Sequence, residues 1–156
     1  TLPTQSQSQP AKMTMPTGWL AFVKTCSAKY GIDPNFALAV AEVESSYKGE
    51  RFRFGKVGKY WLPMGIHQCF EKRWNIADPY INTEVGIKAL ARYKDQRKSL
   101  RKYNTAFNEA YYKRIKFLEA RNRREDESLQ SNQKNKIPRR DCSPPQPRHA
   151  TAGGRP

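Results

Sequence analysis

The sequence contains no run of about 18 apolar residues, so it predicts no helix that is long and apolar enough to cross a membrane. It has only three cysteines, Cys26, Cys69 and Cys142, and their spacing matches no metal-binding pattern. It also lacks a helix-turn-helix pattern, a zinc-finger pattern and internal repeats. These absences argue against an integral membrane protein, a zinc-binding domain and a repeat protein.

Acidic residues are scarce, with 14 Asp and Glu against 29 Lys and Arg, which gives a formal net charge of +15. Residues 17–120 hold 19 basic and 10 acidic residues, and residues 121–156 hold 9 and 4. The excess of positive charge therefore lies in the central segment as well as in the C-terminal one. It favours an anionic partner, which is a nucleic acid, a membrane surface or an acidic cell-wall polymer.

Hydrophobic residues make up 37% of the chain and are concentrated in its centre. Residues 1–16 are rich in Gln, Ser, Thr and Pro, and we expect them to be disordered. Residues 17–121 are expected to form one folded domain. We expect residues 122–156, which are charged and then rich in Pro, Gly and Arg, to form a disordered basic tail.

The apolar pattern of the central segment predicts a mainly α-helical domain with a small β-hairpin. The hairpin is expected over residues 51–61, where its aromatic rings would form either a surface that stacks on sugars or a flap over the core. Cys26 and Cys69 fall in predicted helices, where they are either bridged, if the protein is exported, or free and buried. The expected helices cover residues 18–30, 34–46, 65–73, 82–94, 99–106 and 108–121.

The predicted helix over residues 34–46 carries the most informative acid of the chain. Asp33 is a suitable N-cap and Pro34 suits the first helical position. Glu44 continues an apolar stripe on this helix, so we expect its carboxyl to lose hydration and its pKa to rise. A general acid needs that property, although an acid in an ion pair at the helix end fits the same pattern.

Four sequence blocks carry a resemblance to a known family. The first is YGIDP at residues 30–34 followed by AVAEVESSY at residues 39–47, and the second is MGIHQ at residues 64–68. The third combines Asp78-Pro79 with Asn82 and Gly86, and the fourth is LRKYNT at residues 100–105 followed by YYKRI at residues 111–115. In this order they resemble the lytic transglycosylases with an SLT domain, which share the lysozyme-like fold. The chain departs from the commoner members by a longer segment between the first two blocks.

The resemblance implies a role for individual residues. Glu44 would be the catalytic acid, and Ser45 would hold this acid or the sugar. Gly65 would allow close approach, Gln68 would contact the substrate, and Tyr103 would orient the Glu44 carboxylate by a hydrogen bond. His67 stands where the family usually has Met, and it either contacts a peptide or acetamido group or is a surface histidine. The other residues expected to bind or orient the substrate are Ser46, Met64, Asn104 and Tyr111.

The resemblance also implies cleavage of the MurNAc-GlcNAc β-1,4 bond of peptidoglycan with a 1,6-anhydromuramoyl product. Glu50 is the only acid between residues 45 and 70, which favours a scheme with a single acid and base and with no metal or cofactor. The expected partner is a peptidoglycan glycan strand, and the expected protein is a periplasmic or exported monomer that binds no nucleic acid. The resemblance leaves open a cell-envelope secretion or conjugation assembly as a second partner, and internal or terminal cleavage of the strand.

Three other functions fit parts of the sequence. A muramidase of the same fold would use water, with Glu50 as its second carboxylate. A nucleic-acid-binding module would explain the charge of +15 but not the acid on the apolar stripe. A wall-binding protein that has lost catalysis would not need Glu44, Gln68 and Tyr103, so their presence argues against this function.

Overall fold

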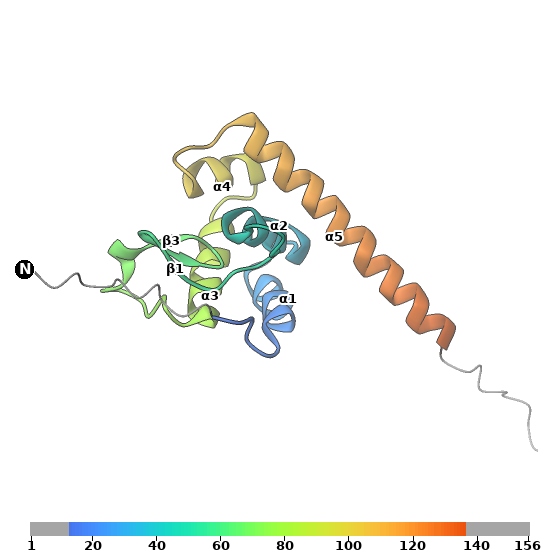
Figure 1. Ribbon diagram of the computed structural model, residues 1–156. Coiled ribbons are helices and arrows are strands. Elements are labelled where there is room, and N and C mark those ends of the chain that lie inside the picture. The colour runs from blue at the N-terminus through green and yellow to red at the C-terminus, as the bar shows by residue number, and fades with distance from the viewer. Residues whose placement is uncertain (1–12, 137–156) are drawn as a thin grey trace, which may run out of the picture.

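The computed structural model describes residues 13–136, and the predictions for residues 1–12 and 137–156 lie outside this range. The described part is mainly helical, with a small antiparallel sheet on one side (Figure 1). Helix α2 lies at the centre of the fold, and the long helix α5 runs along it and extends beyond the other helices (Figure 1). The elements are α1 (Trp19–Tyr30), α2 (Pro34–Ser45), β1 (Gly55–Val57), β2 (Tyr60–Leu62), β3 (Ile66–His67), the 3₁₀ helix η1 (Gln68–Phe70), α3 (Pro79–Leu90), α4 (Gln96–Tyr103) and α5 (Glu109–Lys136).

Helices α1 and α2 begin and end close to the predicted residues, and their caps explain why. Gly31 ends α1 in the left-handed conformation, with φ of 72°, which costs glycine little. The Asp33 side chain accepts a hydrogen bond of 2.8 Å from the Asn35 N–H, and Pro34 occupies the first turn of α2. Between residues 35 and 42 every side chain of α2 is buried, so this helix forms the centre of the core.

The sheet has three strands in the order β1-β2-β3. Gly55 pairs with Leu62 and Tyr60 pairs with His67, so the predicted hairpin is present and a third strand follows it. The predicted helix over residues 65–73 is therefore wrong at its start. Gly65 has φ of 68°, outside the helical region, and Ile66–His67 form ladder hydrogen bonds with β2, which leaves only the short η1.

The aromatic rings of residues 51–61 divide between the two predicted roles, a flap over the core and a surface that stacks on sugars. Phe52 and Phe54 pack edge-on against Trp19, with ring centroids 5.0 and 5.1 Å apart, and so cover the core. Tyr60 is half exposed on the sheet, and the Trp61 Nε1–H donates a 2.7 Å hydrogen bond to Glu71. The segment therefore serves mainly as a flap, with its exposed rings confined to β2.

Two helices begin three residues earlier than predicted, because an aspartate before each acts as its N-cap. Helix α3 begins at Pro79, where the Asp78 carboxylate accepts hydrogen bonds from the N–H groups of residues 80 and 81. Helix α4 begins at Gln96, where Asp95 accepts a 2.8 Å hydrogen bond from the Lys98 N–H. Both helices also end earlier than predicted, at Leu90 and Tyr103.

The predicted disordered tail starts too early, because α5 continues without a break to Lys136. Arg123 pairs with Asp33 at 2.7 Å, and Asp126 pairs with Lys24 at 3.5 Å, so these residues are held against the start of the domain. The sequence beyond residue 121 is also rich in good helix formers such as Arg, Glu, Gln and Lys. Its polarity reflects an exposed helix rather than disorder over residues 122–136.

At the other end, residues 13–16 were also predicted to be disordered, but Met13 forms an isolated antiparallel bridge with Phe54 beside β1. Cys26 and Cys69 are both free, the first buried and the second exposed, so no disulfide joins them. None of the helices between residues 13 and 136 is long and apolar enough to span a bilayer.

Candidate active site

Glu44 lies in the last turn of α2, where the helix leaves the core. Ala37, Val40 and Ala41, which precede it on the same stripe, are at most 1% exposed. Glu44 itself is partly buried, and this burial raises the pKa of its carboxyl above the ordinary value of a glutamate. The predicted stripe and the expected shift are both present in the structure.

The hydrogen bond to Glu44 comes from Tyr111 on α5. The Tyr111 hydroxyl donates to Oε1 of Glu44 over 2.8 Å, and this bond lowers the pKa of Glu44 against the larger effect of burial. Burial and the negative charge of Glu44 raise the pKa of Tyr111 far above its usual range, so Tyr111 stays a neutral donor. The sequence predicted this bond from Tyr103, whose hydroxyl instead donates to the backbone carbonyl of Met64.

Gly65 brings the backbone of the loop between β2 and β3 directly against the acid. A Cβ atom at this position would lie 2.8 Å from Oε2 of Glu44, and φ is 68°. Any side chain would therefore press on the carboxylate as well as strain the backbone. This is the close approach that the resemblance implied for Gly65.

If Glu44 is the catalytic acid that the resemblance implies, Gly65→Ala should lower kcat about 10- to 100-fold, because a displacement of about 1 Å at a reacting group has an effect of this order. Gly58→Ala is a matched control, since Gly58 has φ of 59° and no atom within 4 Å of an added Cβ. The two variants should lose similar stability in urea unfolding, and only Gly65→Ala should lose activity. Equal activity in the two variants would show that the contact with Glu44 does not matter.

The loop that carries Gly65 is held in place by hydrogen bonds to the side chain of Asn82 on α3. This side chain is completely buried, and its Oδ1 accepts a 3.0 Å hydrogen bond from the Met64 N–H. Its Nδ2 donates to the carbonyls of Trp61 and Ile76 over 2.9 and 3.3 Å. The sequence placed Asn82 in the third block of the resemblance without a role, although a lone amide on the apolar face of α3 already indicates a buried hydrogen-bonding role.

The arrangement so far is a partly buried acid with one tyrosine donor, on a helix that a glycine-containing loop approaches. A family model described as the transglycosylase SLT domain matches residues 22–130. The chain belongs to the SLT-domain transglycosylase family. Neither the curated proteins nor the solved structures gave a match. The fold described above is the lysozyme-like fold of this family.

Within the SLT domain, two of the predicted site residues are buried in structural roles. The Ser45 hydroxyl donates a 2.6 Å hydrogen bond to the Ala41 carbonyl inside α2, so it is not turned to Glu44 or to a sugar. The Met64 side chain is 1% exposed and fills the space above Gly86, where an added Cβ would come within 2.7 Å of it. Met64 therefore reaches the site only through its backbone, which holds Tyr103 and Asn82.

In the segment after the loop, the His67 side chain and the Gln68 backbone form local hydrogen bonds. Nδ1 of His67 accepts a 3.1 Å hydrogen bond from the Cys69 N–H, so His67 caps η1. The Gln68 N–H donates to the Lys59 carbonyl over 2.7 Å, and its side chain is half buried. Substrate contacts of His67 and Gln68 stay predictions.

Ser46 and Asn104 are the residues that end α2 and α4. The Asn104 Oδ1 accepts a 2.9 Å hydrogen bond from the Ala106 N–H. Its side chain also interacts with the Tyr111 hydroxyl, where it opposes the rise in the pKa of that group. Asn104 thus lies beside the donor of Glu44.

A second acid of α2, Glu42, is neutralised by arginines and is 5% exposed. Its carboxylate accepts hydrogen bonds from Arg51 and, at 2.9 Å, from Arg121 of α5. Asn122 accepts from both arginines and donates to the Asn35 carbonyl over 3.2 Å. This network fixes α5 on α2 and occupies both carboxylate oxygens of Glu42.

Proposed function

We propose that this chain is a lytic transglycosylase that cleaves the MurNAc-GlcNAc β-1,4 bond of peptidoglycan, with Glu44 as its single general acid and base. The observation that carries the proposal is the environment of Glu44. Burial favours the protonated form, and the Tyr111 hydrogen bond favours the ionised form. A group that must give up and then accept a proton needs both forms to be accessible.

In the first half of the reaction, Glu44 gives its proton to the glycosidic oxygen as the bond to the muramoyl C1 breaks. This leaves an oxocarbenium-like centre and a carboxylate that Tyr111 stabilises. In the second half, this carboxylate takes the proton of the C6 hydroxyl of the same sugar, and that oxygen attacks C1. The ring closes to a 1,6-anhydro product, Glu44 is protonated again, and no water is consumed. An attack from within the same sugar benefits from a high effective concentration.

The surroundings of Glu44 support a scheme without a second catalytic carboxylate. Between residues 13 and 136, only burial and the Tyr111 hydrogen bond shift its pKa, and no charge of another acid contributes. The neighbouring acid Glu42 is held by Arg51 and Arg121. Hydrolysis by two carboxylates requires a second free carboxylate on the other side of the glycosidic bond.

A digest of peptidoglycan analysed by mass spectrometry tests the proposal directly. We expect muropeptides that end in 1,6-anhydromuramic acid. Products heavier by one water molecule would identify a muramidase instead. Intact peptidoglycan after prolonged incubation would contradict both enzymatic functions.

We expect Tyr111→Phe to lower kcat about tenfold, because a hydrogen bond to a charged group is lost. That bond lowers the pKa of Glu44, so its removal raises the pKa further. The acid must be protonated in the free enzyme, so the alkaline limb of the kcat/KM profile should move to higher pH. Tyr112→Phe, next in the chain, is the control and should leave the profile unchanged. An unshifted limb in Tyr111→Phe would contradict the proposed role of this bond.

The substrate also determines where the protein would act. Peptidoglycan lies outside the cytoplasmic membrane, so we propose a periplasmic or exported enzyme that works as a monomer on glycan strands. Its net charge of +15 suits a polymer that bears lactyl and peptide carboxylates. Service to an envelope secretion or conjugation assembly is a further proposal, which the family resemblance alone supports.

A further inference from the structure

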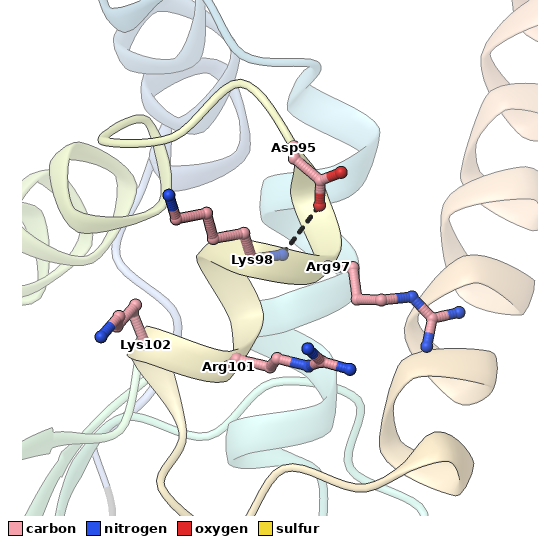
Figure 2. Close-up of a pocket in the computed structure, with 5 residues that line it drawn as sticks. All are labelled: Asp95, Arg97, Lys98, Arg101 and Lys102. Carbon is pink, nitrogen blue, oxygen red and sulfur yellow. Dashed lines mark hydrogen bonds between the residues drawn. The ribbon is translucent and has the colours of Figure 1, made fainter.

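Helix α4 presents a continuous cationic face on the side away from the core. Its inward positions, Ser99 and Leu100, are buried. Its outward positions Arg97, Lys98, Arg101 and Lys102, together with Asp95, line an open depression of about 500 Å³ (Figure 2). The two lysines extend to one side of the helix and the two arginines to the other, toward α5 (Figure 2).

Few acids neutralise this face. Asp95 is engaged as the N-cap of α4 (Figure 2). Arg97 is paired with Glu109, but within residues 13–136 no ion pair holds Lys98, Arg101 or Lys102. Residues 92–116 hold nine basic and two acidic residues, so about half of the net charge of the chain lies in this short segment.

The cationic face leads directly to the catalytic centre. Lys102 is followed by Tyr103, whose hydroxyl donates a hydrogen bond to the Met64 carbonyl. Gly65, the residue after Met64, packs against the Glu44 side chain. Helix α4 has eight residues, or about 12 Å of axis, so the face begins one residue before Tyr103 and extends about that length away from it. A polymer bound across Glu44 can therefore place its side branches on α4.

The side chains of this face favour carboxylates over the other anionic partners. Three aromatic rings next to it are already covered by cations: Tyr93 by Lys98 at 4.6 Å, Tyr112 by Arg97 at 4.1 Å, and Phe107 by Arg101 at 5.4 Å. These rings are not free to stack on the bases of a single-stranded nucleic acid. The depression has no apolar lining residue that could enter a lipid surface. Arginine and lysine donate charge-assisted hydrogen bonds to carboxylates.

We propose that the outer face of α4 binds the carboxylates of the peptide that the glycan strand carries, and thereby selects strands with peptides over bare strands. This inference rests on the proposed function, because it assigns the substrate branch that the site recognises. Lys98 and Lys102 contact the peptide, and Arg101 supports them from the other side of the helix. Glu44 and its neighbours act on the sugar chain itself.

The test compares Lys98→Gln/Lys102→Gln with the wild type on two substrates, peptide-bearing glycan strands and the same strands freed of peptide by an amidase. Glutamine keeps the helix propensity of lysine and removes the charge. We expect KM on the peptide-bearing strands to rise about 3- to 10-fold, with kcat unchanged, as for the loss of two exposed ion pairs. On the bare strands the variant should equal the wild type, and Lys98→Arg/Lys102→Arg should restore the KM.

Lys134→Gln/Lys136→Gln is the matched control, because it removes the same charge from the far end of α5 (Figure 1). An equal rise in KM in this control, or an equal rise on both substrates, would overturn the proposal in favour of general charge. An unchanged KM in Lys98→Gln/Lys102→Gln would overturn it as well.

Binding separates the inference from the proposed function. In the Glu44→Gln background, co-sedimentation with insoluble peptidoglycan before and after amidase treatment measures binding without cleavage. We expect weaker binding after the peptides are removed, and no such difference once Lys98 and Lys102 are also replaced. A wild type that cleaves neither substrate refutes the proposed function, while the binding difference still decides the inference. Tighter binding of a single-stranded oligonucleotide, lost in the same lysine variant, would assign the face to nucleic acid and overturn the proposal.

Discussion

Replacing Glu44 by glutamine is expected to lower kcat on peptidoglycan by at least about 10³-fold. Glutamine keeps the size of the side chain and accepts the Tyr111 hydrogen bond, but it can neither donate a proton to the leaving oxygen nor take one from the C6 hydroxyl. General acid–base catalysis contributes about 10²- to 10⁴-fold for one positioned group, and here one group serves both steps. The measurement is the rate of release of soluble muropeptides. Activity within tenfold of the wild type would remove Glu44 from the mechanism.

The same variant provides its own folding control. Burial raises the pKa of Glu44 in the folded state above its unfolded value, so the folded protein binds the proton more tightly. The stability of the wild type therefore falls as the pH rises through the raised pKa. Glu44→Gln lacks this loss, so it should resist urea at least as well as the wild type at neutral pH. The expected result is an inactive but not destabilised protein, which separates a catalytic role from a structural one.

Asn82→Leu should be the most damaging change at a residue that cannot touch the substrate. It leaves the buried Met64 N–H and Ile76 carbonyl, and the partly buried Trp61 carbonyl, without their partner. Each such group costs about 1–3 kcal/mol, so we expect a loss of about 3–5 kcal/mol in the free energy of unfolding. Urea unfolding followed by circular dichroism measures this loss. Activity should fall with it, because the loop that holds Gly65 against Glu44 is no longer fastened.

Two further variants make the Asn82 result specific. Asn75→Leu places the same substitution at an exposed position and should change the stability by less than about 0.5 kcal/mol. Asn82→Asp keeps an acceptor for the Met64 N–H but loses both donors and buries a charge, so it should also be strongly destabilised. If Asn82→Leu were as stable as Asn75→Leu, the loop would have to be held in another way.

The sequence predicted those features that depend on neighbouring residues. The start of α2 follows from Asp33 and Pro34, and the raised pKa of Glu44 follows from its place on an apolar stripe. The starts of α3 and α4 were predicted three residues too late, although Asp78 and Asp95 are good N-caps, because Asn82 and Ser99 are also residues that can begin a helix.

The features that the sequence missed depend on contacts between distant segments. Tyr103 and Tyr111 both lie near the acid, and only the packing of α4 and α5 decides which hydroxyl reaches it. The continuation of α5 depends on partners such as Asp33, about ninety residues earlier in the chain. The third strand depends on the pairing of Ile66 with Trp61, which a short apolar run does not reveal.

The hydrogen bond between Tyr111 and Glu44 joins residues that are 67 positions apart in the chain. Glu44 is synthesised before its donor Tyr111 and before the long helix α5 that packs along α2. A nascent or clipped chain that ends before α5 thus contains the acid without the neighbours that tune it. The proposed proton transfer therefore requires α5 to be synthesised and packed on α2, and a chain truncated before residue 109 is expected to be inactive.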